Sequence, residues 1–336
     1  MVEQTRGYIA SAQERYAEAA GAFERCLALE ALPEGAQLNT QYNLAQLYLA
    51  MERFDDAIRT LKDWFARAEN PAPSAYYLLA AAYMQSGRSD LALEPARKAV
   101  ENSADPKEPW LQLLLALYLE RKDYQRARTL LERLVARFPK KTYWLQLSAV
   151  YAELGREKDT LAVMQIAYQK NLLDKDSELR NLARMYLYHE IPYRAARVLE
   201  KGLADGIVEP DAKAWELLAD AWLSAREYDK AIEPLRRAAK LSDDGKFYLR
   251  LGRLFMERQE WKDAAQSIEA ALEKKKLDER GKAWVLLGIA RFSAGDRAGA
   301  RRAFEKARTF EDGAAEAERW LAHLDRLERR DRSDGS

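Results

Sequence analysis

The sequence predicts an all-α fold, a right-handed α-solenoid of about nine helical hairpins followed by one capping helix. Two observations indicate this fold. A small residue recurs along the chain, and the same pattern of large and small apolar residues accompanies each copy. The recurring residues are Ala19, Ala57, Ala92, Ala127, Thr160, Ala195, Ala231, Ala264 and Ala300, at spacings of 38, 35, 35, 33, 35, 36, 33 and 36 residues. Such a unit cannot bury its apolar face alone, so the hairpins must stack.

The most complete copy of the pattern runs from Trp284 to Ala307. Here Leu287 and Gly288 form a large-then-small pair, and Phe304 provides the bulky residue of the following helix. This pattern resembles the tetratricopeptide repeat, in which two antiparallel helices interlock through these positions. An aromatic residue follows the large-then-small pair by three residues in seven of eight copies, and Arg291 replaces it in the last. The resemblance covers nearly the whole chain.

The domain organisation follows from this reading. A chain of 336 residues exceeds the usual size of one globular core, but a solenoid grows by adding neighbours. We therefore expect one array over residues 1–313, a capping helix over 314–328 and a disordered tail over 329–336. Glu3 and Arg6 replace apolar residues of the pattern, so we expect the first repeat to be truncated and the natural protein to have residues upstream.

Glycine and proline punctuate the predicted helices. Gly87, Gly155 and Gly295 stand where first helices should end. Pro95 and Pro234 fall inside second helices at the same register. Because proline removes an N–H and crowds the carbonyl four residues back, we expect bends or late helix starts at both places.

Composition narrows the classes of partner. The chain has 55 basic and 54 acidic residues, and no apolar run is long enough to cross a bilayer. The balanced charge argues against nucleic acid as a partner. The single cysteine, Cys26, occupies a small-residue position and is expected to be a buried apolar group rather than a reactive thiol.

The sequence contains no recognisable catalytic constellation. Its two histidines, His189 and His323, have no second histidine or cysteine at metal-ligand spacing. A phosphate-binding glycine loop and a nucleophile elbow are also missing from the sequence. We therefore expect a non-enzymatic protein without metal or cofactor.

The concave groove is the predicted partner-binding surface, because first helices line it in tetratricopeptide arrays. Its N-terminal half should present neutral amide and tyrosine side chains, namely Asn39, Tyr42, Asn43, Gln46, Tyr77, Gln112 and Gln146. Its C-terminal half should be basic with two acids, and includes Arg180, Asn181, Arg184, Lys213, Glu216, Asp220, Lys246, Arg250, Arg253 and Lys282. Arginine pairs with carboxylates, so we infer a peptide or protein ligand that is polar at one end and acidic at the other.

Alternatives remain open at this point. These side chains are also consistent with an ordinary solvated groove in an array that binds through its convex side or loops. The lysines of the carboxylate clamp found in chaperone-binding relatives are absent, which argues against that role. Tryptophans such as Trp215, Trp222 and Trp320 occupy pattern positions, so a core role is favoured over ligand stacking.

Four segments resemble proteobacterial tetratricopeptide proteins that accompany TonB, ExbB and ExbD. The segments are Gln4–Ile9, Gln37–Leu44, Ala68–Pro73 and Pro192–Glu200. The resemblance implies a periplasmic accessory protein of the TonB energy-transducing system, with a cleaved leader upstream and no catalytic residue. The second hypothesis is a cytoplasmic adaptor or a regulatory subunit of an enzyme complex. Binding to a TonB, ExbB or ExbD component would distinguish the two.

Overall fold

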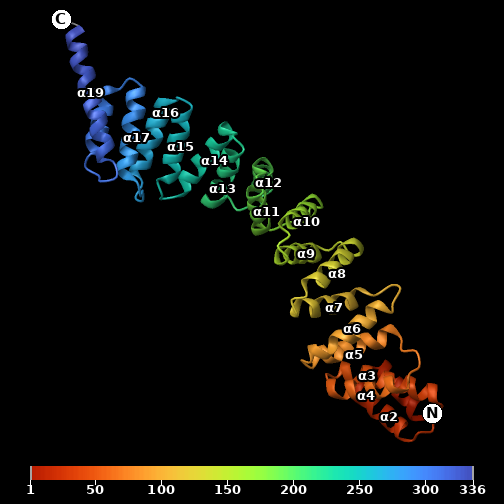
Figure 1. The fold of residues 1–336 in the computed structure, drawn as a ribbon. Helices are drawn as coiled ribbons and strands as arrows, with labels where there is room; N and C mark the ends of the chain where they lie inside the picture. Colours follow the sequence, from red (N-terminus) through yellow and green to blue (C-terminus); the bar gives the residue numbers. More distant parts are fainter. Residues whose placement is uncertain (1, 335–336) are drawn as a thin grey trace. The chain divides into compact units, whose positions relative to one another are not determined.

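The computed structural model describes residues 2–334 and shows nineteen α-helices in that range, with no strand beyond a single isolated bridge between Asp244 and Lys276. The chain forms two compact units, residues 1–164 and 165–336, and the boundary falls within helix α10 (Glu157–Gln169). Helices of the first unit run from red to yellow in Figure 1, and those of the second run from green to blue.

The odd-numbered helices up to α17 are called first helices here, and the even-numbered ones second helices. In the first unit the helices are α1 (Val2–Ala12), α2 (Tyr16–Ala28), α3 (Glu34–Ala50), α4 (Phe54–Arg67), α5 (Pro73–Gln85), α6 (Ser89–Glu101), α7 (Glu108–Glu120), α8 (Tyr124–Arg137) and α9 (Lys141–Glu153). In the second unit they are α11 (Asp176–Tyr188), α12 (Pro192–Ala204), α13 (Ala212–Ser224), α14 (Tyr228–Leu241), α15 (Lys246–Glu257), α16 (Trp261–Glu273), α17 (Arg280–Ser293), α18 (Arg297–Ala307) and α19 (Ala314–Asp334).

Within each unit a helix packs mainly on the helices that directly precede and follow it. Thus α3 contacts α2 and α4, and α13 contacts α12 and α14. Contacts between one first helix and the next, as between α11 and α13, are fewer. This nearest-neighbour packing of hairpins is that of an α-solenoid and confirms the predicted fold class.

The same turn joins the two helices of all nine hairpins. Its central residue has a positive φ and lies five positions before the small residue of the repeat; these residues are Glu14, Glu52, Gly87, Lys122, Gly155, Glu190, Arg226, Gln259 and Gly295. The next residue donates its N–H to the carbonyl five positions back, as Arg53 does to Tyr48 at 2.8 Å and Asp296 to Arg291 at 2.9 Å. This is the Schellman arrangement that ends helices. Only three of the nine turns have the glycine that the sequence analysis used as a stop signal.

The predicted interlock of small and large residues is present in both units. A Cβ added to Gly7 would lie 2.3 Å from Phe23 Cε1, and one added to Gly288 would lie 2.4 Å from Phe304 Cε1. Glycine thus lets the second helix approach the first at van der Waals contact. The recurring alanines, including Ala57 and Ala231, are 0% exposed. Cys26 is buried as expected.

The departures from the repeat pattern have structural explanations. Thr160 satisfies its buried hydroxyl by donating to the carbonyl of Arg156 at 3.0 Å. Arg291, which replaces an aromatic residue, donates through Nε to Glu269 at 3.1 Å. Tyr48 donates in the same way from the aromatic position to Glu24, on the preceding second helix, at 2.6 Å. Arginine therefore keeps a link that a tyrosine makes elsewhere.

The prolines do not delay their helices. Helix α6 begins at Ser89, before Pro95, and α14 begins at Tyr228, before Pro234. The late starts that the sequence analysis allowed are wrong for both helices. The hairpin turn and the buried alanines Ala92 and Ala231 place the first turn of each helix upstream of the proline, so only one backbone hydrogen bond is lost.

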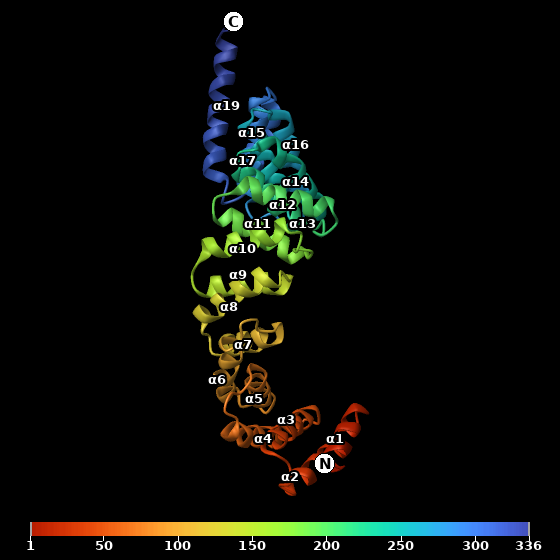
Figure 2. The same cartoon turned by 90° about the vertical axis from the view of Figure 1, so that its right-hand side faces the viewer.

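The final helix lies on the last repeat, as expected. Ala317, Leu321 and Leu324 are buried in one cluster with Phe304, and Trp320 stacks on Phe304 with ring centroids 5.4 Å apart. Figure 2 shows α19 as the long blue helix that extends beyond α17. An end of the apolar core is thereby covered.

Helix α19 is longer than the sequence predicted. It continues to Asp334, so residues 329–334 are helical and the disordered tail expected from residue 329 is wrong over that range; residues 335–336 lie outside the described chain. Arg301 of α18 pairs with Asp325 at 2.6 Å and Glu328 at 3.0 Å, which holds the helix near its last apolar residues. Arginine and glutamate are good helix formers, so the helix continues past the last apolar contact. Of the helices within residues 2–334, none combines the length and apolar character needed to span a membrane.

Candidate partner-binding surfaces

In the first unit the predicted groove residues lie on first helices, on the sides that do not enter the core. Asn39 and Gln46 of α3 are exposed, and neither makes a hydrogen bond with a side chain in the described part of the chain. They are seven residues apart, which places them on one face of the helix, two turns apart. Tyr42 and Asn43 lie between them and are half-buried.

Neutral hydrogen bonds join this face to the neighbouring repeats. Asn43 Nδ2 donates to Tyr8 Oη at 3.2 Å, and Tyr42 Oη donates to Ser74 Oγ at 3.4 Å. Two hairpins further on, Gln112 Nε2 donates to Tyr143 Oη at 2.6 Å. The amide and tyrosine side chains therefore link successive first helices as well as facing solvent.

Tyr143 is the most constrained of these groups. It is buried, and its hydroxyl donates to the carboxylate of Glu108 on the preceding first helix. Burial, together with this hydrogen bond, raises the pKa of Tyr143 to about 12. Tyr143 is not among the groove residues that repeat spacing predicts, although it lies on the same first helix as Gln146.

Two further predicted residues are tied into the floor of this face. Tyr77 stacks on Trp110 of the next first helix, with ring centroids 5.8 Å apart and planes inclined by 24°. The Oε1 atom of Gln146 is buried and has no hydrogen-bond partner among the described residues. Tyr77 and Gln146 therefore form part of the floor of this face and do not project into solvent as free side chains.

Arg180 of α11 corrects the expected character of the second unit. Its side chain is only 8% exposed, and its guanidinium pairs with Asp176 at 2.7 Å and Asp211 at 2.9 Å. It also donates to the backbone carbonyl of Glu209 at 3.0 Å. Burial works against its charge, but these hydrogen bonds and carboxylates raise the pKa of Arg180 overall. Arg180 therefore fixes α11 to the start of α13 and is not available as a surface cation.

Four other cations of this face also have carboxylate partners, three of them on a neighbouring repeat. Lys246 pairs with Glu216 at 2.9 Å, and Arg250 contacts Asp220. Arg253 and Lys282 both pair with Glu279, at 3.4 and 2.7 Å. Asp211 and Glu279 therefore offset part of the expected excess of basic charge, which is smaller than repeat spacing indicated. Whether these residues bind a partner stays a prediction.

Arg184 and Asn181, both exposed on α11, differ from these neighbours. Arg184 makes no ion pair with any residue in the described range. Asn181 has a contact of 3.8 Å with the sulfur of Met185, within the same helix. Arg184 thus provides a cation that a ligand carboxylate could reach. Further along the chain, a separate hollow of about 290 Å³ is lined by Lys246, Arg250, Arg253 and Glu279 among others.

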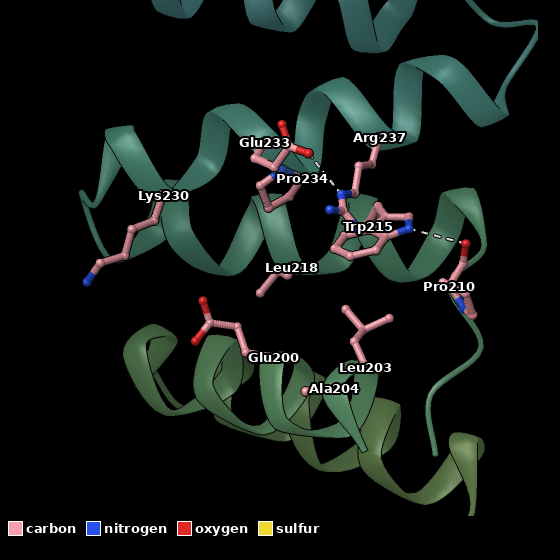
Figure 3. A pocket seen from close by; sticks show the side chains of 10 residues that line it. All are labelled: Glu200, Leu203, Ala204, Pro210, Trp215, Leu218, Lys230, Glu233, Pro234 and Arg237. Atoms are coloured by element: carbon pink, nitrogen blue, oxygen red, sulfur yellow. Dashed lines mark hydrogen bonds and ion pairs between the residues drawn. The ribbon is translucent and has the colours of Figure 1, made fainter. Parts of the chain in front are cut away.

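A larger pocket in the second unit lies between the second helices α12 and α14. Its volume is about 470 Å³. Figure 3 shows the ten side chains that line it: Glu200, Leu203, Ala204, Pro210, Trp215, Leu218, Lys230, Glu233, Pro234 and Arg237. The sequence analysis assigned Trp215 to the core, but it is half-buried and forms a wall of this pocket. Its neighbours on two other helices could not be inferred from repeat spacing alone.

Family models identify the repeat. The model described as tetratricopeptide repeat matches residues 42–109, 180–246 and 249–318, and a second model of the same description matches residues 111–141. The chain belongs to the tetratricopeptide repeat family. Apart from Asp176, the residues named above for the surfaces of the second unit lie within the matched segments.

Individual tetratricopeptide proteins are more distant. BBSome complex member BBS4 of Bos taurus is 26% identical over 286 residues, which cover 83% of this chain and 47% of that protein. The chain therefore spans about half the length of this curated relative. A solved structure of Naa15/Naa10 bound to HypK-THB contains a chain with 13% identity and a TM-score of 0.50, matched over 96% of this chain and 65% of that chain. The crystal structure of MamA protein matches 52% of this chain and 94% of its own, with 21% identity and a TM-score of 0.42.

Within the described residues, no group of three or more His, Cys, Asp or Glu side chains could hold a metal ion. His323 packs edge-on against Phe292 and Trp320, and His189 packs against Tyr188. A hollow of about 330 Å³ beside His323 is lined by Glu316, Arg319 and Trp320. We found no nucleophile with an adjacent base in these places.

Proposed function

We propose that this tetratricopeptide protein is a non-enzymatic scaffold that binds a protein or peptide on its first-helix faces. The observation that carries the proposal is that Asn39, Gln46 and Arg184 are exposed there and have no polar partner within the described chain. Their neighbours, by contrast, are tied to adjacent repeats. A rigid surface with a few unpaired polar groups suits recognition, because little ordering is needed on binding.

The chemistry of these groups defines the ligand. Carboxamides such as Asn39 and Gln46 can donate to and accept from the backbone of an extended peptide. Arg184 can form a two-pronged hydrogen bond with a carboxylate. The preferred ligand of α3 is therefore a polar segment, and that of α11 is a segment with an acidic residue.

We further propose that the partner belongs to the bacterial envelope and that the protein is a periplasmic accessory of a TonB-type system. The support is the resemblance of segments such as Gln37–Leu44 and Pro192–Glu200 to tetratricopeptide proteins that accompany TonB, ExbB and ExbD. The similar protein BBS4 is a member of a protein complex, the BBSome, which supports a scaffolding role more generally.

Affinity capture tests both parts of this proposal. The tagged protein, expressed in the periplasm of a proteobacterium, should retain TonB, ExbB or ExbD. The double substitution Asn39→Ala and Gln46→Ala, or Arg184→Glu alone, should reduce retention about tenfold, which corresponds to the loss of one or two hydrogen bonds to a ligand. Ala136→Glu, on the exposed side of second helix α8, provides the matched control.

Two results would argue against the proposal. Retention that is unchanged by all three first-helix substitutions would exclude these faces as the binding surface. Stable co-purification with a cytoplasmic enzyme, from a native gene without an export signal, would favour the alternative of a cytoplasmic adaptor or regulatory subunit.

A further inference from the structure

We infer that the pocket between α12 and α14 is a second docking site, and that its occupant is an acidic segment of a partner protein with large apolar side chains. This site is independent of the first-helix faces. It lies against two second helices and reaches one first helix, α13, at its floor.

The pocket offers an apolar floor with room for more than one side chain. Leu203 and Ala204 come from α12, Trp215 and Leu218 from α13, and Pro234 from α14. In Figure 3 these groups face one another across the gap between the helices. A volume of about 470 Å³ falls within the range typical of ligand pockets. Leucine or phenylalanine side chains of a partner would cover these apolar groups and bury them from water.

Trp215 is held in place before any ligand arrives. Its Nε1 donates to the carbonyl of Pro210 at 3.2 Å. The guanidinium of Arg237 lies over the ring, 4.6 Å from its centroid, and Arg237 Nε donates to Glu233 at 2.9 Å. The tryptophan and the arginine are the residue types most often found at the energetic centre of an interface. Their fixed geometry reduces the entropy lost on binding.

The charge around the pocket favours an acidic occupant. Helix α12 carries three basic residues and one acidic residue, and α14 carries four basic and two acidic residues. The carboxylates on the rim already have partners: Glu200 pairs with Arg197 at 2.9 Å, and Glu233 with Arg237. Among the described residues, Arg237 makes no hydrogen bond through its two Nη atoms.

The opposite end of the pocket carries a second cation. Lys230 lies over the rings of Trp222 and Tyr193, with its Nζ 4.6 and 5.3 Å from their centroids, and it also pairs with Glu227 at 3.2 Å. Figure 3 shows Lys230 and Arg237 on α14 at the two ends of the apolar floor. Acidic residues on both sides of an apolar pair would therefore meet basic groups.

Fluorescence anisotropy with the purified full-length chain tests the inference. The probe is a short fluorescein-labelled peptide of Glu, Leu and Phe residues; one control peptide has Ala in place of Leu and Phe, and another has Lys in place of Glu. We expect the probe to bind with a Kd of about 10–100 μM, and both control peptides to bind at least about tenfold more weakly. Raising the salt concentration should weaken binding of the probe.

A matched pair of substitutions locates the binding. Ala204 is exposed and lines the pocket, so Ala204→Glu adds bulk and a repelling charge without altering the core. Ala136 is exposed at the same repeat position of α8, nine residues after Ala127 as Ala204 is nine after Ala195. Ala204→Glu should weaken probe binding at least about tenfold, whereas Ala136→Glu should leave it unchanged. Leu203→Asn serves as a second pocket variant, and circular dichroism checks the fold of each.

Several outcomes would overturn the inference. Equal weakening by Ala204→Glu and Ala136→Glu would show binding elsewhere, and equal binding of the Lys peptide would remove the charge argument. Sedimentation of the wild-type chain as a dimer that Ala204→Glu dissociates would assign the pocket to a second copy of the chain instead. Because Arg184→Glu tests the first-helix face, its effect on envelope partners does not depend on this result.

Discussion

The first-helix faces of the two units are built at equivalent repeat positions but joined by different chemistry. In the first unit many of the links are neutral hydrogen bonds, such as Gln112 to Tyr143 at 2.6 Å and Asn43 to Tyr8 at 3.2 Å, although Glu108 also pairs with Lys140 at 2.7 Å. In the second unit they are ion pairs, such as Arg180 with Asp211 and Lys246 with Glu216, both at 2.9 Å. The repeat therefore determines where neighbouring helices meet, and the side chains at those places determine the charge and the stability of each face.

The largest expected effect is the loss of the Arg180 link. Arg180→Ala should destabilise the hairpins of α11 to α14 by about 2 kcal/mol, because two carboxylates and a carbonyl lose a buried donor. Gln112→Ala, its neutral counterpart in the first unit, should cost about 0.5–1 kcal/mol. Native-state hydrogen exchange measures each region separately, which matters because repeat arrays can unfold in parts.

The control for this comparison is Arg253→Ala. Arg253 is exposed, and its pair with Glu279 spans 3.4 Å, so its removal should cost no more than about 0.5 kcal/mol. Equal losses for the Arg180 and Arg253 variants would contradict the distinction between a buried link and a surface pair.

Substitutions in the glycine–phenylalanine interlock should cost similar stability in both units, because this packing is part of every repeat and does not depend on the side chains of the first-helix face. A Cβ at Gly7 or Gly288 would come within 2.3–2.4 Å of Phe23 or Phe304. Gly7→Ala and Gly288→Ala should each cost about 1–2 kcal/mol through overpacking. Thermal unfolding measures the loss, and a combined Phe304→Leu substitution should recover part of it for Gly288→Ala. A cost confined to one unit would show that the interlock is not shared.

Tyr143 in the first unit and Asp211 in the second should link stability to opposite ends of the pH range. The pKa of Tyr143 is raised to about 12, so its contribution is present below the unfolded value near 10 and is lost as the pH rises from about 10 to 12. Burial of Asp211 opposes its charge, but the hydrogen bonds from Arg180 and from the Ala214 N–H lower the pKa overall; that contribution is present above about pH 4 and is lost as the pH falls below it.

Single substitutions isolate these two contributions. Tyr143→Phe should reduce the loss of stability between pH 10 and 11 by about 1 kcal/mol, and Asp211→Asn should reduce the loss below pH 4. Denaturant unfolding at fixed pH values measures both. Alkaline sensitivity that Tyr143→Phe leaves unaltered would assign it to other tyrosines.

The smallest expected effect is that of salt. The exposed pairs of the second unit, such as Lys246 with Glu216, should each lose less than about 0.5 kcal/mol between 0.1 and 1 M NaCl, and the neutral links of the first unit should lose nothing. Hydrogen exchange at the two salt concentrations compares α15 with α5, which has no charged residue and receives the neutral Tyr42–Ser74 hydrogen bond. A larger loss in α5 would reverse the assignment of chemistry to the two faces.

Much of the fold could be predicted from the sequence because the repeat is defined by close packing. The nine small residues, from Ala19 to Ala300, mark positions where two helices approach closely, and the hairpins were predicted from them. The turns were harder to recognise. Glu52, Arg226 and Gln259 adopt a positive φ that glycine would have signalled, because the surrounding helices impose the turn. The length of α19 was missed for a different reason, since residues 329–334 have no apolar stripe and continue the helix through their helix propensity.

The candidate surfaces were less predictable. Repeat spacing places Arg180 and Arg250 on the first-helix face, but it does not reveal that Asp211 and Asp220 reach them from neighbouring repeats. The α12–α14 pocket depends on three helices and a proline carbonyl, and no single repeat contains its pattern. Trp215 was a signal for it, yet a tryptophan at a pattern position is also what a buried core residue looks like.

Site-specific photo-crosslinking tests the central claim most directly. A benzoylphenylalanine placed at Gln46 or Arg184, on first helices, should form an adduct with a captured envelope partner, and one at Ala136 on second helix α8 should not. Each site is exposed, so the probe itself is tolerated equally. Adducts from Gln46 and Arg184 alone are the result we predict, and adducts from Ala136 without any from the first helices would contradict the account.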